Sequence, residues 1–304
     1  MPPMNTPANP GRPELRPLER ARGLLACLAA YAAAGGIAAL TGWLAGELHP
    51  IWAVGLADLA ATVVVFLFSL AFDNSSLYDP YWSVLPPFLA LYWLLRAGAR
   101  GVPTRQALAG ALLAAWAVRL TFNWARRWKG LRHEDWRYAG YRRAGAAYWP
   151  ISFAGFHLMP TIVVFLGCLP LWPALTAPGR AFGLLDLAAV LVTAGAITLE
   201  AAADRQLARF LRSDGHEKIL DTGLWSLSRH PNYFGEVAFW WGLWLFGLAA
   251  DPSWWWTVAG PVAMTTLFLG ISVPMMDRHL LARRPEYAAH LRRRSGFLPW
   301  LPRP

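Results

Sequence analysis

Eight apolar stretches constrain this chain more than any other feature of its sequence. They lie at about residues 23–44, 51–72, 82–95, 107–120, 151–171, 184–203, 234–248 and 254–273. A membrane-spanning helix needs about 20 apolar residues, and backbone facing lipid must satisfy its own hydrogen bonds. Each stretch therefore predicts a helix rather than an open-edged strand. The expected fold is an all-α polytopic membrane protein, a bundle of seven or eight transmembrane helices.

The composition excludes an ordinary soluble enzyme and a disordered chain. Of the 304 residues, 56% are hydrophobic and 15% are charged, whereas soluble domains carry about 45–50% and about 25%. The 18 tryptophans suit a chain that meets two lipid–water interfaces. The stretch 82–95 is short and contains Pro86 and Pro87, so a break or a re-entrant turn there would leave seven spans.

The charge distribution predicts the orientation of the chain. Four arginines precede the first apolar stretch, which is too long for a cleavable signal. Basic residues accumulate on the cytoplasmic side, so we expect a cytoplasmic N-terminus with residues 1–22 as a disordered tail, and segments 121–150, 204–233 and 274–304 in the cytoplasm. Three arginines conflict with this orientation, because it places them on the outer side of the membrane: Arg96, Arg100 and Arg105.

Several common sites are absent from the sequence. It contains no G-x-G-x-x-G, no P-loop and no H-E-x-x-H, and its seven histidines have no metal-ligand spacing. Cys27 and Cys168 lie within apolar stretches and are expected to be small buried residues rather than a disulfide or thiolate site. The basic residues flank membrane spans and no nucleic-acid module is present, so we predict neither a metal nor nucleic acid as ligand.

Ionisable residues inside spans indicate function, because they are costly in lipid. Asp58 lies within the second stretch, and Glu200 and Asp204 share a face at the end of the sixth. Two basic stripes follow the same helical spacing, Arg205, Arg209 and Arg212 in one, and Arg119, Asn123 and Arg126 in the other. These stripes fit two interpretations: anchors extending to headgroups, or a pocket for a phosphate-rich ligand.

The densest motif is GLWSLSRHPNYFGE at residues 223–236. Pro231 suits the first turn of a helix, and Asn232 and Glu236 then share one face. A carboxylate at the start of an apolar helix needs hydrogen-bond donors, and amide or ribose hydroxyl groups of a ligand would supply them. A well-capped helix start explains the motif equally well.

This stretch resembles the C-terminal domain of the steroid 5α-reductase superfamily, which are multi-span NADPH-dependent reductases of activated carbon–carbon double bonds. The resemblance runs from about Ala196 to Pro302, ending in FLPW. Within the superfamily the chain looks most like the bacterial DUF1295 group, through NSSLYDPYWSVLP at 74–86 and WARRWKGLRHEDWRY at 124–138. The RHPNY core is less specific, because isoprenylcysteine carboxyl methyltransferases carry a similar block.

The resemblance implies that different parts of the chain bind the substrate and the cofactor. Residues 23–150 would form the substrate side and residues 151–304 the cofactor side, with a cytoplasmic loop at 126–143, including Trp136 and Tyr138, capping NADPH. The positions implied to bind the cofactor are Glu200, Asp204, Arg209, Arg212, Lys218, Arg229, Asn232, Tyr233 and Glu236. Two departures stand out: Glu200 replaces an asparagine, and PMMDRH at 274–279 replaces a histidine-rich segment.

Reduction of an enone places charge on the carbonyl oxygen, which needs an acid or hydrogen-bond donor. The N-terminal half is expected to supply it. Tyr78 is our candidate donor, with Asp79 to orient it and Asp58 as a second acid. The resemblance also implies a glutamate–tyrosine pair on early helices, which the sequence does not place residue by residue.

The predicted function is an NADPH-dependent reductase of a lipophilic enone, steroid-like or isoprenoid, in a bacterial inner membrane. Two alternatives stay open: an S-adenosylmethionine-dependent membrane methyltransferase and a non-catalytic lipid-binding protein. A methyltransferase needs less phosphate-binding charge than an NADPH-dependent reductase, so the arginine stripes disfavour the methyltransferase. The expected partners are a lipophilic small molecule and membrane lipids, and the sequence does not determine the oligomeric state.

Overall fold

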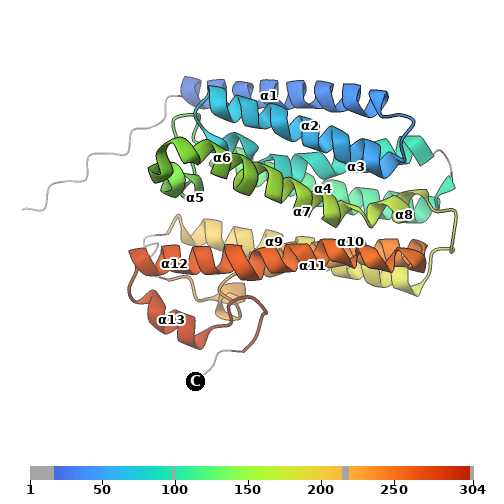
Figure 1. The fold of residues 1–304 in the computed structure, drawn as a ribbon. Helices are drawn as coiled ribbons and strands as arrows, with labels where there is room; N and C mark the ends of the chain where they lie inside the picture. The colour runs from blue at the N-terminus through green and yellow to red at the C-terminus, as the bar shows by residue number, and fades with distance from the viewer. Residues whose placement is uncertain (1–16, 98–99, 214–218, 302–304) are drawn as a thin grey trace, which may run out of the picture.

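A bundle of long helices with roughly parallel and antiparallel axes forms the molecule (Figure 1). The computed structural model describes residues 17–97, 100–213 and 219–301. Within these residues the regular elements are helices, and the only extended pairing is a bridge between Ser228 and Ser295. The predicted all-α fold is confirmed.

The helices form two layers (Figure 1). The first layer contains α1 (Pro17–Leu44), α2 (Pro50–Ala71), α3 (Tyr81–Ala97), α4 (Pro103–Arg127), α6 (Tyr148–Ser152), α7 (Met159–Cys168) and α8 (Leu171–Thr176). The second contains α9 (Leu184–Phe210), α10 (Pro231–Ala250), α11 (Ala259–Leu267) and α12 (Val273–Arg283). One apolar core, which includes Cys168, Trp240 and Leu243, joins the layers. The division between layers follows α8 rather than residue 150.

Among the residues that the structure describes, six helical segments are long and apolar enough to cross a membrane, so the chain is a multi-pass membrane protein. They are Pro17–Leu44, Pro50–Ala71, Pro103–Arg127, Trp136–Cys168, Leu184–Phe210 and Pro252–Arg283. The last of them begins with the 3₁₀ segment η6 (Pro252–Val258), and two segments contain π-helical turns, η4 (Phe153–Leu158) and η7 (Phe268–Ser272). Two shorter helices, α3 and α10, lie among the six, and α3 continues unbroken through Pro86 and Pro87.

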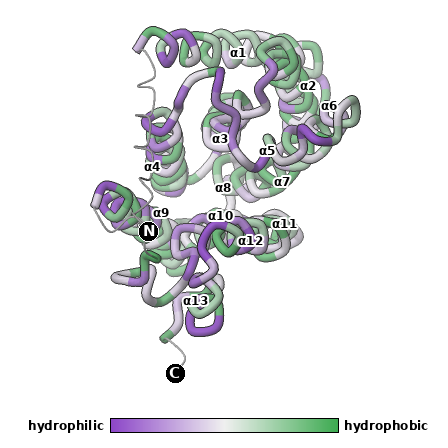
Figure 2. Tube along the Cα trace, turned by 90° about the vertical axis from the view of Figure 1, so that its left-hand side faces the viewer, coloured by the Kyte–Doolittle hydropathy of each residue, from purple (hydrophilic) through white to green (hydrophobic). Residues whose placement is uncertain are grey.

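The long helices extend beyond the apolar stretches at the polar end of the bundle, which we define by residues 124–148, 205–213, 219–230 and 278–297. Figure 2 looks along the bundle from this end, where hydrophilic segments gather around α5 (Trp136–Ala139) and α13 (Tyr287–Arg293). Helix α1 begins at Pro17, so residues 17–22 of the predicted tail are helical, while residues 1–16 lie outside the described chain. The extensions of α4 and α9 carry polar side chains that the site uses.

At the opposite end, an ion pair accounts for the burial of one of the three arginines that conflict with the predicted orientation. Arg105 is fully buried, and its guanidinium contacts both carboxylate oxygens of Asp186 at 2.5 and 2.9 Å. Arg96 donates a hydrogen bond to the carbonyl oxygen of Gly46. The ion pair explains how Arg105 is buried, but the conflict with the predicted orientation stays, because the rule counts basic residues and not net charge.

Helices α9 and α10 pack closely because glycines of α10 face α9. A Cβ atom at Gly235 would lie 2.4 Å from Cγ of Glu200, and one at Gly242 would lie 2.2 Å from Oγ1 of Thr193. Contacts that short force a neighbour to move. The glycine spacing thus fixes how near Glu200 lies to the first turns of α10.

We expect Gly235→Ala to lower stability by about 1–3 kcal/mol, because the methyl group displaces the Glu200 side chain or separates the two helices. Thermal unfolding in detergent measures the effect. The matched control is Gly195→Ala on α9, where an added Cβ meets nothing within 4 Å. That control is expected to stabilise by about 0.5–1 kcal/mol. Equal melting temperatures for the two variants would contradict the close contact at Gly235.

Candidate functional site

Arg119 of α4 joins the two layers through a network of charged side chains. Its guanidinium contacts Glu200 in a short ion pair and Asp204 at 2.8 Å, and Asn123 donates to the same oxygen of Asp204 at 2.9 Å. The i,i+4 spacing on both helices places each pair on one face. The side chains of Arg119 and Glu200 are only 14% and 4% exposed. Arg119 is therefore a buried cation held by two acids, and not a lipid anchor.

Glu236, one turn into α10, is bound by three tryptophans. The indole nitrogens of Trp82 and Trp240 donate to its Oε1, and that of Trp116 donates to Oε2, each at 3.0 Å. Indole nitrogens act only as donors, so they suit a carboxylate. These three tryptophans come from α3, α10 and α4, and they hold Glu236 in one position. Sequence reasoning assigned the tryptophans to the membrane interfaces and missed this role, although Trp240 follows Glu236 at the i+4 spacing.

Two buried oxygens at the α9–α10 contact have no hydrogen-bond donor among the described residues. They are Oε1 of Glu200 and Oδ1 of Asn232. The side chain of Glu200 packs against α10 at Gly235, which lies three residues after Asn232. An unsatisfied buried acceptor costs about 1–3 kcal/mol. Asn232 Oδ1 is therefore suited to accept a donor from a ligand. Glu200 also lies beside the carboxyl group of Glu236, so either a ligand donor or a proton shared between the two acids would satisfy it.

The predicted cationic positions separate into different groups. Arg209 and Arg212 are exposed at the polar end of α9, and Lys218 lies outside the described residues. Arg229 is largely buried and contacts Asp277 at 3.0 Å and the carbonyl oxygen of Leu291, so it holds the C-terminal segment. Of the three arginines that the resemblance implies for the cofactor, Arg209 and Arg212 are therefore the two that are accessible to a soluble anion.

Tyr233 lies on the same turn of α10 as Asn232, in an aromatic group. Its ring stacks on His230 at a centroid distance of 5.1 Å and packs edge-on against Phe268, also at 5.1 Å. Phe268 in turn contacts Trp82. These rings connect the beginning of α10 with the beginning of α3.

The beginning of α3 places an acid beside a tyrosine. Asp58 of α2 is 2% exposed and accepts a hydrogen bond from the hydroxyl of Tyr81 at 2.8 Å, while its Oδ2 has no partner among the described residues. Tyr78, the tyrosine that the sequence favoured, bonds instead to Thr161 at 2.7 Å and stacks on Tyr81. The structure thus joins Asp58 to Tyr81, three residues after the tyrosine that the sequence favoured.

Asp79 does not orient Tyr78. Its carboxylate accepts hydrogen bonds from Tyr138 at 2.5 Å and from Arg137 at 3.1 Å. Asp79 lies in the connection between α2 and α3, where burial raises its pKa and the nearby Arg137 opposes that rise. Its contacts are all to the loop that follows α4, so Asp79 anchors that loop.

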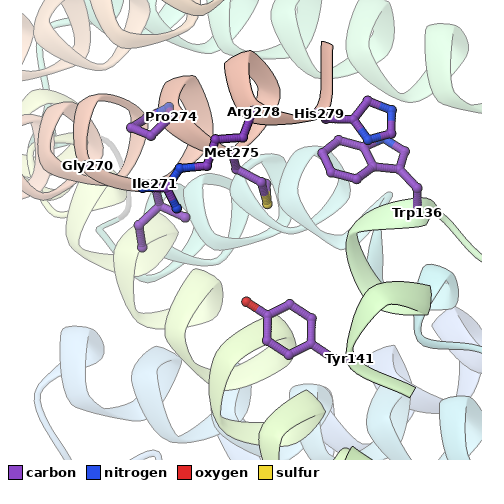
Figure 3. A pocket seen from close by; sticks show the side chains of 8 residues that line it. All are labelled: Trp136, Tyr141, Gly270, Ile271, Pro274, Met275, Arg278 and His279. Atoms are coloured by element: carbon purple, nitrogen blue, oxygen red, sulfur yellow. The ribbon is translucent and has the colours of Figure 1, made fainter. Parts of the chain in front are cut away.

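The loop 126–143 bridges the two layers, as a capping segment would. Glu134 accepts hydrogen bonds from the backbone of Ser75 at 2.8 Å and from Arg142 at 2.7 Å. On the other side, the ring of Trp136 stacks on His279 of α12 with centroids 3.7 Å apart (Figure 3). Arg132 pairs with Glu19 of α1. The predicted cap is therefore held by ion pairs and stacking, and whether it covers a cofactor stays a prediction.

Neither of two cavities formed by described residues is lined by a residue predicted to bind the cofactor or to act in catalysis, although Trp136 and Tyr141 of the predicted cap line one of them. One, of about 430 Å³, lies between the α5 region and α12 (Figure 3). The other, of about 440 Å³, is an apolar groove between α3 and α4. Neither Arg119 nor Glu236 lines either of these cavities.

Comparison with known proteins places the chain in a family. It is 26% identical over 253 residues to an uncharacterized protein of Schizosaccharomyces pombe, C594.04c, and the match covers 75% of this chain and 73% of the yeast protein. No solved structure matches the chain. The sequence profile described as "Protein of unknown function (DUF1295)" matches residues 65–294, most of the chain and all of the site described above except Asp58. The chain belongs to the DUF1295 family.

Proposed function

We propose that this protein is a membrane-embedded reductase that transfers a hydride from NADPH to a carbon–carbon double bond of a lipophilic enone, steroid-like or isoprenoid. The observation that carries the proposal is the buried Asp58–Tyr81 pair, whose carboxyl group keeps one oxygen free. Steroid 5α-reductases, which the chain resembles, use an acid–tyrosine pair on early helices. Asp58 and Tyr81 lie on α2 and α3.

The pair has the chemistry that enone reduction requires. Charge develops on the carbonyl oxygen of the enone, and a positioned hydroxyl or carboxylic acid stabilises it. Tyr81 supplies a phenol, and a protonated Asp58 would donate through Oδ2. The surrounding helices exclude water, which strengthens these hydrogen bonds.

The residues at the α9–α10 contact fit a nicotinamide dinucleotide. Glu200 Oε1 and Asn232 Oδ1 are free acceptors, matching the carboxamide and ribose hydroxyl donors of such a molecule. Arg209 and Arg212 at the end of α9 would contact its phosphates. When bound, the cofactor supplies the hydride. Trp82 follows Tyr81 on α3 and bonds Glu236, so the two parts of the site are linked through one helix.

In this proposal the polar end of the bundle faces the cytoplasm, where NADPH is present, and α3 and α10 complete a set of eight spans. The membrane is the bacterial inner one. Arg209, Arg212 and the capping loop would then lie on the cytoplasmic side, as a soluble cofactor requires.

The test is NADPH binding to the full chain in neutral detergent, measured by isothermal titration calorimetry. Wild-type protein is expected to bind NADPH, and Arg209→Gln/Arg212→Gln to bind at least about tenfold more weakly, because each charge-assisted phosphate contact contributes about 1.5–3 kcal/mol. Both arginines are exposed, so the variant should fold.

Arg143→Gln, an exposed arginine of the same polar end, is the matched control and should bind like wild type. Binding that falls equally in the control would indicate general electrostatic attraction instead of a site. Folded wild-type protein that binds no NADPH would exclude the reductase, and S-adenosylmethionine and lipids would then be titrated in the same way.

A further inference from the structure

The cavity between the α5 region and α12 shares Trp136 and Tyr141 with the capping loop, and its other lining residues lie outside the proposed reductase site. Trp136 and Tyr141 form one wall (Figure 3). The opposite wall is a single face of η7 and α12, composed of Gly270, Ile271, Pro274, Met275, Arg278 and His279. The cavity thus has a polar part toward the end of the bundle and an apolar part toward the membrane-spanning segment.

Two polar groups point into this cavity from opposite sides. The side chain of Arg278 extends back along α12 toward Ile271, and the hydroxyl of Tyr141 points in from the facing wall (Figure 3). That direction takes the guanidinium toward the apolar part of the helix. Arg278 is exposed at the polar end of α12, so its guanidinium is accessible to an anionic group, which an arginine can bind through two parallel hydrogen bonds.

The acids near Arg278 are already engaged. Asp277 accepts contacts from Arg229 at 3.0 Å, His230 at 2.9 Å and Tyr287 at 2.8 Å. Asp135 is paired with Arg137 at 2.7 Å. Arg278 itself has no ion pair within the described part of the chain. The protein therefore leaves the anionic partner of Arg278 to a ligand.

The apolar part of the cavity has room for a hydrocarbon chain. Ile271 is 50% exposed, and a Cβ atom at Gly270 would meet nothing within 4 Å. Both residues belong to the π-helical turn η7, and such turns occur frequently at functional sites. The Trp136–His279 stack bounds the polar part.

We infer that this cavity binds an anionic amphiphile taken laterally from the bilayer, with its headgroup between Arg278 and Tyr141 and its chain along Gly270 and Ile271. This ligand is distinct from NADPH, and its binding does not depend on the proposed reductase. An anion on a lipid, and not a free anion, satisfies both parts of the cavity at once.

Native mass spectrometry of the full chain in neutral detergent tests this inference, without cofactor. The probes are phosphatidylglycerol, phosphatidylcholine with the same acyl chains, and glycerol 3-phosphate. Wild-type protein should bind phosphatidylglycerol about fivefold more tightly than phosphatidylcholine, as expected for one arginine at the membrane surface. Arg278→Gln should remove this preference, and Gly270→Phe, which fills the cavity, should weaken binding of both lipids.

Arg283→Gln is the matched control, because Arg283 is exposed on the same helix but does not line the cavity. It should keep the wild-type preference. Equal loss in Arg278→Gln and Arg283→Gln would overturn the inference in favour of general surface charge. Glycerol 3-phosphate that displaces phosphatidylglycerol at equal concentration would also overturn it, because the site would then take a free anion. Unchanged lipid binding by folded Gly270→Phe would exclude the cavity as the site.

Discussion

Replacing Arg119 by methionine is expected to destabilise the protein by about 3–5 kcal/mol, the usual cost of removing one partner from a buried ion pair. The change leaves Glu200 and Asp204 without their cation in the interior of the bundle. Methionine keeps the length and apolar character of the side chain, so the loss reports charge rather than packing. The measurement is the thermal or denaturant unfolding of the full chain in detergent.

Two further variants separate this electrostatic effect from others. Arg126 lies two turns further along α4, and the Cζ atom of its guanidinium is 5.5 Å from the centroid of the Phe122 ring. Arg126→Met should therefore change stability by less than about 1 kcal/mol. The triple variant Arg119→Met, Glu200→Gln, Asp204→Asn has no unpaired charge and should recover most of the loss. A similar loss in Arg119→Met and Arg126→Met would contradict the network.

Asp58→Asn is expected to reduce turnover by about 10²–10⁴-fold while NADPH binding stays unchanged, because the amide keeps the contact with Tyr81 but cannot act as an acid. The assay is NADPH consumption with the enone that a substrate screen identifies. Tyr81→Phe should produce a loss of the same order, because it removes the phenol that bonds Asp58.

Tyr78→Phe is the discriminating comparison. The hydroxyl of Tyr78 forms a hydrogen bond with Thr161 and not with Asp58. Removing it should therefore reduce turnover less than removing the Tyr81 hydroxyl does. A large loss in Tyr78→Phe together with normal activity in Tyr81→Phe would restore the tyrosine that the sequence favoured. Full activity in Asp58→Asn would exclude the acid–tyrosine pair from the reaction.

Much of the site could be found from sequence because short-range spacing is preserved in a helix. The i,i+4 relation placed Glu200 and Asp204 on one face of α9, and Arg119 and Asn123 on one face of α4. The sequence could not show that these faces meet, since Arg119 and Glu200 are 81 residues apart. It therefore left Arg119 as either an anchor or a phosphate ligand, and the structure shows a third role.

The tryptophans illustrate the same limit. In a membrane protein, composition favours an interfacial position for any tryptophan, because its ring is apolar and its nitrogen is polar. Trp82 and Trp116 instead direct that nitrogen to Glu236 from 154 and 120 residues away. Only the packing of α3, α4 and α10 brings three donors to one carboxylate.

The sequence by itself determined that this chain is helical and multi-pass, because apolar segments in lipid must satisfy their backbone hydrogen bonds internally. It also indicated Asp58 and Glu200 as ionisable residues that enter the bundle, because they lie inside apolar stretches. Only the tertiary structure decided the partners of ionisable residues: Tyr81 for Asp58, Asp186 for Arg105 and Tyr138 for Asp79. The physical reason is that a buried charge is stabilised by whichever partner the packing places within hydrogen-bond distance, and no local pattern in the sequence specifies that partner.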